Sequence, residues 1–394
     1  MIDRLRHIMK RESKASAAVV AVTRPGGPVW TPRNYASLAR EGYERNVIAY
    51  RCVRLVAEAA ASAPLIAEAN GEVLAEHPLL DLLAHPNKDE TGAALLERLY
   101  GFLQTAGNAY LEAVRLDGVP RELYALRPDR MKPRLGRDGW ISGYDYVVGD
   151  RRTAFTPDAD GFSPILHLKL FHPTNDHFGL SPLEAAAAPV DLHNAALAWN
   201  KALLDNAARP SGALIYKGPQ GAENLTSDQF DRLKAELSDA YSGPSNAGRP
   251  LVLDGGLDWK SMSFTPSDMD FQEAKNAAAR EIALAFGVPP MLLGIPGDNT
   301  YANYREANLA FWRQTVIPLV KKTAAALSGW LSRSFEEGEV RLSCDTGAIE
   351  ALSADRDAAW RRVTAADFLT DAEKRRLLGL PPRDPEIETE TDNV

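Results

Sequence analysis

Two long helical patterns separated by a non-helical insert constrain the fold of this chain more than any other feature of its sequence. The first helix, 183–207, follows Ser181, an N-cap residue with proline next to it and glutamate three positions on. The second helix, 267–286, begins at the N-cap residue Ser267. At 1.5 Å per residue the two helices span roughly 38 Å and 30 Å. The insert, 208–266, is therefore carried at the end of two helical struts.

Apolar side chains recur along both helices. On the first helix, Leu183, Val190, Leu197 and Leu204 lie seven residues apart and predict one apolar seam. Pro189 interrupts this helix and is expected to bend it. The second helix carries an apolar stripe made of Phe271, Ala274, Ala278, Ile282 and Phe286.

The chain has 394 residues, enough for two or three structural regions, and its 45% hydrophobic and 25% charged residues are typical of a globular protein. Between residues 35 and 182, helical and strand periodicities are mixed. Helices are expected over Asn46–Ala63 and Thr91–Thr105, with a turn-rich stretch, 77–87, between them. Strands are expected at Asn108–Arg115, Glu122–Arg127, Ile141–Val148 and Ile165–Phe171. The predicted fold class is α+β.

The insert and the C-terminal part continue the mixed pattern. Inside the insert, strands are expected at Gly212–Tyr216 and Pro250–Leu253, with a helix over Ser227–Tyr241 between them. After the second strut comes a polar loop, 294–300, that has almost no apolar side chain to anchor it. The remaining expected elements are a long helix, Tyr301–Ser334, bent at Pro318, a strand, Val340–Ser343, and two short helices, Asp355–Ala366 and Asp371–Leu378.

Both ends of the sequence differ in composition from the rest. Residues 1–34 are expected to form a flexible arm, in which the first fourteen residues carry five Lys or Arg and two acids. Ile2, Leu5, Ile8 and Met9 of this arm have helical spacing. A solvated arm and a specific contact with a nucleic acid or a protein both fit this pattern. The segment 386–394 carries four acids and is expected to be disordered.

Overall composition excludes several classes of protein. The formal charge of −8, from 45 basic and 53 acidic side chains, argues against tight binding of DNA through its phosphates. Cys52 and Cys344 are far apart and have no CxxC partner, which excludes a disulfide framework and favours a reducing compartment. The longest apolar run, Ala17–Val22, is far shorter than a membrane span, and no secretory signal is recognisable.

The sequence carries no convincing motif for catalysis or for cofactor or metal binding. The sequence contains no GxxxxGK[ST], HExxH or GxSxG motif, and no GxGxxG after a strand. His167, His172 and His177 are five residues apart, a spacing that suits neither a helix face nor a strand face. Asp158 and Asp160 begin like a calcium loop, but its twelfth position is a lysine. We therefore expect no catalytic residue, no cofactor and no metal, and no enzymatic activity.

Several local strings, in order along the chain, resemble those of one protein family. They are HPLLDLLAHPN (77–87), GNAYLE (107–112), HLKLFHPTNDHFGLSPLEAA (167–186), NAARPSGAL (206–214), GRPLVLDGGLDWKSMSFTPSDMDFQEAK (248–275), IALAFGVPPMLLG (282–294) and FLTDAEKRRLLGLPP (368–382). With them, the chain resembles the portal proteins of long-tailed bacteriophages, of the compact type, over about 35–385. Gene transfer agents, which are phage-like particles, use similar portals.

This resemblance implies a portal fold and a role at one capsid vertex. The protein is expected to form a homo-oligomeric ring, typically dodecameric, through which the terminase packages DNA and DNA later leaves. Its implied partners are the terminase large subunit, the head–tail adaptor, the major capsid protein and double-stranded DNA as passing cargo, with no membrane. It would be assembled in the bacterial cytoplasm and reside in the virion or phage-like particle.

The resemblance also implies a division of the chain and a set of site residues. The expected regions are a wing (35–182), stem helices (183–207 and 267–290), a clip (208–266), a channel loop with a long bent helix (291–340) and a C-terminal wing or short crown (341–385). The channel loop would include Gly297, Asp298, Asn299 and Thr300; its alternative is a plain interhelical connection capped by Asn299 or Thr300. Docking candidates on the clip are Lys217, Glu223, Asp228, Lys234 and Glu236, and ring-packing candidates are Leu197 and Ile282.

Two observations made without the resemblance agree with it. A pair of struts that carries an insert suits a protein that passes through a capsid opening and presents a docking face outside. An acidic ring also suits a conduit, because DNA that moves past it must not be held by many phosphate contacts. Another head–tail connector or capsid protein remains an alternative, and a DNA-processing enzyme is a weaker one, because it would need a metal or nucleotide motif.

Overall fold

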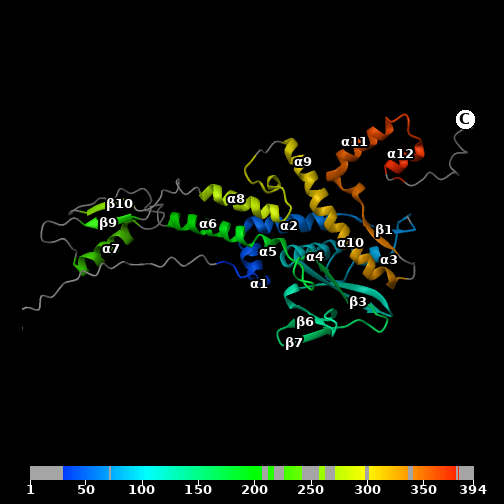
Figure 1. Ribbon diagram of the computed structural model, residues 1–394, viewed down its shortest axis with the longest axis horizontal. Coiled ribbons are helices and arrows are strands. Elements are labelled where there is room, and N and C mark those ends of the chain that lie inside the picture. Colours follow the sequence, from blue (N-terminus) through cyan, green and yellow to red (C-terminus); the bar gives the residue numbers. More distant parts are fainter. Residues whose placement is uncertain are drawn as a thin grey trace, which may run out of the picture. The chain divides into compact units, whose positions relative to one another are not determined.

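The computed structural model of the chain mixes helices with antiparallel sheets, so the α+β prediction is confirmed (Figure 1). It describes residues 30–70, 72–205, 212–216, 226–241, 257–261, 271–297, 301–335, 340–378 and 380. The first helices are α1 (Tyr35–Leu38), a π-helical segment (Ala39–Glu44), α2 (Val47–Ser62), α3 (Pro78–Ala84) and α4 (Gly92–Ala106).

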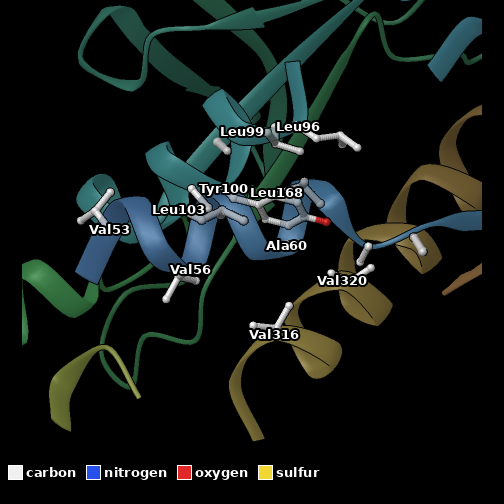
Figure 2. Close-up of a cluster of buried hydrophobic side chains, with 14 of the residues drawn as sticks. Val53, Val56, Ala60, Leu96, Leu99, Tyr100, Leu103, Leu168, Val316 and Val320 are labelled. Carbon is white, nitrogen blue, oxygen red and sulfur yellow. The ribbon is translucent and has the colours of Figure 1, made fainter. Parts of the chain in front are cut away.

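The main hydrophobic core lies among α2, α4 and the C-terminal helix α10 (Ile317–Leu331). Both N-terminal helices begin where the sequence predicts, because Asn46 and Thr91 cap them: Asn46 Oδ1 accepts hydrogen bonds from the amides of the second and third helical residues. Figure 2 shows Val56 and Ala60 of α2 between Leu99 and Tyr100 of α4 and Val320 of α10. Burial of this many apolar side chains fixes the three helices against one another.

A three-stranded sheet follows α4 directly and packs against it. Its strands are β4 (Val119–Leu126), β3 (Asn108–Leu116) and β8 (Ile165–Lys169), in that spatial order. Gly107 joins helix and strand in a left-handed conformation, with φ +69°, and a Cβ there would lie 2.5 Å from the carbonyl oxygen of Gly179. The helix therefore turns into the strand at a position that only glycine fits.

A second sheet lies against the first through a small aromatic cluster. It contains β5 (Met131–Leu135), β6 (Ile141–Val148) and β7 (Arg151–Phe155), paired in that order. Tyr144 of β6 meets Tyr110 of β3 edge-on, with ring centroids 5.8 Å apart, and His167 of β8 stacks on Tyr110 at 4.3 Å. The strand predicted over Ile141–Val148 is confirmed, whereas β5 and β7 were not predicted.

The stretch 77–87 is not a series of turns, and that expectation is wrong. Residues Pro78–Ala84 form α3, and His77 Nδ1 accepts a hydrogen bond from the amide of Leu79 at its start. Leu79, Leu82 and Leu83 are buried, and Pro78 is the first helical residue, where proline favours the start of a helix. Next to it lies a sheet of β11 (Arg341–Cys344), β1 (Leu65–Ala69) and β2 (Glu72–Leu74).

The first strut is broken near its start rather than bent at Pro189. Ser181 caps α5 (Pro182–Ala185) as predicted, since its Oγ accepts from the Glu184 amide at 2.9 Å. After the break at Ala186, helix α6 runs over Ala187–Asp205. Pro189 lies in the first turn of α6, where its missing N–H has no helical partner to lose. The second strut is α8 (Phe271–Ala285).

The described part of the insert agrees with the predicted strand and helix. It contains β9 (Gly212–Tyr216), paired antiparallel with β10 (Leu257–Ser261), and α7 (Ser227–Tyr241). The bounds predicted for the first strand and for the helix are confirmed at both ends. The strand expected at Pro250–Leu253 lies outside the described residues, and β10 was not predicted.

The long C-terminal helix is continuous but irregular. Helix α9 (Tyr301–Phe311) passes through a π-helical segment (Trp312–Val316) into α10, so the irregularity precedes Pro318. Short 3₁₀ turns occur at Pro128–Arg130, Pro290–Leu293, Ser332–Ser334, Thr346–Ala348 and Glu350–Leu352, and the chain then forms α11 (Ser353–Thr364) and α12 (Asp371–Leu377).

Candidate functional site

The two struts, α6 and α8, pack side by side and form the candidate assembly site. Ala278, Ile282 and Phe286 of the predicted stripe are buried, which confirms that face of α8. Ile282 has no exposed surface and lies in the core of its own subunit. It supports the fold of the strut rather than touching a neighbouring subunit directly, so its assignment as a ring-packing contact is corrected.

The buried face of α6 does not follow the predicted seven-residue seam. Leu183 and Val190 are buried, but the buried face continues through His193 and Ala196, while Leu197 is 37% exposed. Val190, His193 and Ala196 follow one another at intervals of three residues, so the buried face of α6 drifts away from the seven-residue seam and leaves Leu197 outside it. Leu197 thus remains a candidate for contact with a second subunit.

A buried polar cluster ties α6 to the start of α2. Asn46 Nδ2 lies 3.2 Å from His193 Nδ1 and donates to Asn194 Oδ1 at 2.9 Å, while Asn194 Nδ2 donates to the Glu41 carbonyl oxygen at 2.9 Å. Burial, with a smaller contribution from Lys275, lowers the pKa of His193. The Nδ1 atom of a neutral His193 can accept a hydrogen bond from Asn46 Nδ2, while the side-chain oxygen of Asn46, Oδ1, caps α2.

A second contact fixes the chain that enters α1 to the same helix. The backbone amide of Thr31 donates to Asp191 Oδ2 at 2.9 Å, and its hydroxyl donates to Asp191 Oδ1 at 2.5 Å. Sequence analysis singled out none of Asn46, His193, Asn194 and Asp191 as a contact. Only Asn46, an N-cap residue before an apolar run, left a local signal; the others depend on which helix lies opposite.

The docking candidates on the insert are partly described. Asp228 and Lys234 are exposed on α7, as a docking surface requires. Lys217 and Glu223, and the side chain of Glu236, lie outside the described residues. Phe230, on the apolar face of this helix, is 57% exposed.

The channel-loop candidates are also divided. Gly297 is exposed, whereas Asp298, Asn299 and Thr300 lie outside the described residues. The start of the loop is better anchored than expected, because Ile295 is buried and its amide donates to the Pro290 carbonyl oxygen at 3.3 Å. One guanidinium nitrogen of Arg280 on α8 also donates to the carbonyl oxygen of Pro296.

The weak metal candidates have other partners. His167 Nε2 donates to Asn108 Oδ1 at 3.0 Å, and burial lowers the pKa of its imidazole to about 4. Asp158 and Asp160 form ion pairs with Arg115 at 3.1 and 2.9 Å. No cluster of three or more His, Cys, Asp or Glu side chains able to hold a metal occurs within the described ranges. Nor does any helix in that part of the chain have the length and apolarity to span a membrane.

The chain is similar over most of its length to known portal proteins and particle components. The family model for phage portal proteins matches residues 48–379. The neck of a native gene transfer agent particle, solved with C12 symmetry, contains a chain that is 54% identical and aligns with a TM-score of 0.70 over 91% of this chain and 96% of that one. A Rickettsia bellii protein is 46% identical over 86% of this chain and 88% of its own length. The portal protein of Enterobacteria phage HK97 is 26% identical, with 84% of this chain and 78% of that protein covered.

Proposed function

Because this chain belongs to the phage portal protein family, we propose that it forms the ring through which DNA enters and leaves a phage-like particle. The family match establishes the general role of the protein. The protein is a portal or connector component of a particle, a ring-forming and capsid-associated protein, and not an enzyme. Its place in the particle is the portal vertex.

The observation that carries the proposal is the 54% identity, over nearly the whole of both chains, to the neck protein of a gene transfer agent. Identity to the HK97 phage portal is much lower, at 26%. We therefore favour a gene transfer agent over a true phage as the source of the particle. The C12 symmetry with which that neck was solved supports a ring of twelve subunits. We further propose that the ring assembles in the bacterial cytoplasm.

The regions of the chain receive roles in this proposal. The wing is 35–182, the stem is α6 and α8, the clip is 208–266, and the crown is the C-terminal part up to 385. The close packing of α6 on α8 supports the stem, because two joined helices can hold the insert away from the core. The exposed side chain of Leu197 would pack against the next subunit.

The proposed partners follow from this division of the chain into wing, stem, clip and crown. The terminase large subunit and the head–tail adaptor would dock on the clip, where Asp228 and Lys234 are exposed. Double-stranded DNA would pass the loop 294–300 without being held, since the subunit is acidic. Reversal of the charges of Asp228 and Lys234 should weaken terminase binding and leave the ring intact.

The test is the mass of the purified full-length chain in solution. Twelve copies of a 43.0 kDa chain form a closed ring of roughly half a megadalton. Mass photometry should show this species, and electron micrographs should show rings with a central channel. A chain that remains monomeric at micromolar concentration, or that forms open filaments, would contradict the proposal.

A further inference from the structure

A groove on the surface of the helical core has no role in the proposal so far. It lies between the α1 segment, α2 and α4 and has a volume of about 360 Å³. Its lining includes the small residues Ala57 and Gly101 and the ring of Phe102, together with the charged side chains of Arg54, Glu97 and Arg98. A recess of this size with small and aromatic residues fits an inserted apolar side chain.

Gly101 is the residue that points to an occupant. It lies within α4, where glycine is less favourable than alanine because its backbone is freer in the unfolded chain. A Cβ at Gly101 would meet no atom of this chain within 4 Å, so no contact inside the subunit requires glycine there. In contrast, a Cβ at Gly92 of the same helix would lie 2.0 Å from the Leu83 carbonyl oxygen. A larger side chain at position 101 would extend into the groove without displacing another residue near its Cβ.

The same chain presents a suitable apolar side chain that is not part of the groove. Phe171 is 80% exposed, in the loop 170–180 that connects β8 to α5. The loop is held at both ends: the Leu170 amide donates to the Gly107 carbonyl oxygen at 2.9 Å, and the Gly179 amide donates to Asn108 Oδ1 at 2.8 Å. An aromatic side chain on a fixed loop binds without a large ordering cost.

Internal hydrogen bonds hold this loop as well. Asn175 Oδ1 accepts from the amides of His177 and Phe178, both at 2.9 Å. Asp176 is exposed on the loop, and the lining of the groove carries two arginines, Arg54 and Arg98, and one glutamate, Glu97. Both arginines have ion-pair partners, since Arg54 pairs with Glu97 at 3.4 Å and Arg98 pairs with Glu90 at 2.9 Å. The lining itself has a net positive charge, which is opposite in sign to Asp176.

We infer that Phe171 of one subunit inserts into the groove at Gly101 of the next subunit in the ring. This inference rests on the proposed ring. A ring of identical subunits is built from head-to-tail interfaces, in which each subunit contributes two different surfaces. A protruding aromatic residue on one surface and an apolar recess on another meet that requirement without any other partner.

The experiment measures assembly of the full-length chain over a range of concentrations by mass photometry. Phe171→Ser removes the inserted side chain, and Gly101→Leu fills the recess while favouring the helix. Each should raise the concentration at half-assembly on the order of 30-fold, with circular dichroism unchanged. The matched controls are Phe368→Ser, at an exposed position of similar size, and Gly329→Leu in α10, where a Cβ also meets nothing within 4 Å. Both controls should assemble like the wild type.

The double variant tests whether the two positions meet. If Phe171 enters this groove, Phe171→Ser with Gly101→Leu should assemble no worse than either single variant. Independent, multiplying effects would place Phe171 elsewhere and overturn the inference, as would normal assembly of either single variant or an equal loss in the controls. If the wild type assembles in these cases, the proposed ring still stands; a wild type that never assembles overturns both.

Discussion

The substitution His167→Phe tests the physical account of the junction between the sheet of β4, β3 and β8 and the sheet of β5, β6 and β7. The imidazole stacks on Tyr110 with centroids 4.3 Å apart and meets Tyr144 edge-on at 5.8 Å. Phenylalanine keeps an aromatic ring in this place but cannot be protonated. The acceptor left behind, Asn108 Oδ1, still receives the Gly179 amide at 2.8 Å, so the substitution leaves no unsatisfied group there.

The magnitude follows from the pKa of His167, which burial lowers to about 4 from an ordinary value of 6.5. The folded chain binds this proton more weakly than the unfolded chain, so the free energy of unfolding decreases as the pH falls below 6.5. Each pH unit between the two pKa values is worth about 1.4 kcal/mol. The wild type should therefore lose about 3 kcal/mol between pH 6.5 and 4, and this loss is absent from the phenylalanine variant.

The assay is urea unfolding of both proteins at one fixed concentration, from pH 7.5 to 4.5. The stability of the variant relative to the wild type should rise by about 2.5 kcal/mol across this range. The control is His85→Phe, at an exposed histidine, which should reproduce the wild-type profile. Parallel curves for His167→Phe and the wild type would refute the reasoning, because they would mean that the buried imidazole is protonated as easily as in the unfolded chain.

Three further predictions concern the core, the ring and the channel. Gly107→Ala should cost several kcal/mol in thermal unfolding, since its Cβ would lie 2.5 Å from the Gly179 carbonyl oxygen, whereas Gly139→Ala, with φ +81° but open space, should cost about 1 kcal/mol. Ile282→Asp should prevent folding, because a buried charge removes several kcal/mol of a total of about 5–15, and Leu197→Asp should give folded monomers; rings from Leu197→Asp would exclude that face as an interface. Asp298→Lys should leave the ring intact and reduce the number of DNA-filled particles, because lysine attracts phosphates; normal filling would place the loop away from the DNA.

Helix boundaries were predictable where a cap lies next to the helix in sequence. Asn46, Thr91, Ser181 and Thr370 each accept a hydrogen bond from the first turn of a helix that begins at the predicted place or next to it. Capping is a local interaction, so a short string of residues contains its whole signal. The strands β1 and β2 were missed for the opposite reason: β1 pairs with β11, and its residue Leu65 lies opposite Cys344.

The candidate site was less predictable than the helices that carry it. Periodicity identified the apolar stripe of α8 but could not tell that Ile282 faces its own subunit and that Leu197 faces outward. That distinction depends on the groups packed against each strut, which for α6 are the helix α8 and the buried Asn46 rather than another leucine seam. Gly101 and Phe171 gave only weak local signals, a glycine inside a helical pattern and an aromatic residue in a polar loop.

The π-helical segment Trp312–Val316 accommodates one additional residue in the middle of a long helix. A π-type turn contains about one residue more than an α-helical turn, so the chain completes the same turn with one more residue. The faces of α9 and α10 are therefore kept in phase across the segment. Removal of one residue from it would let this turn close as ordinary α-helix with the two faces unchanged, whereas removal of one residue from α9 itself would rotate the side chains before that point by about 100°.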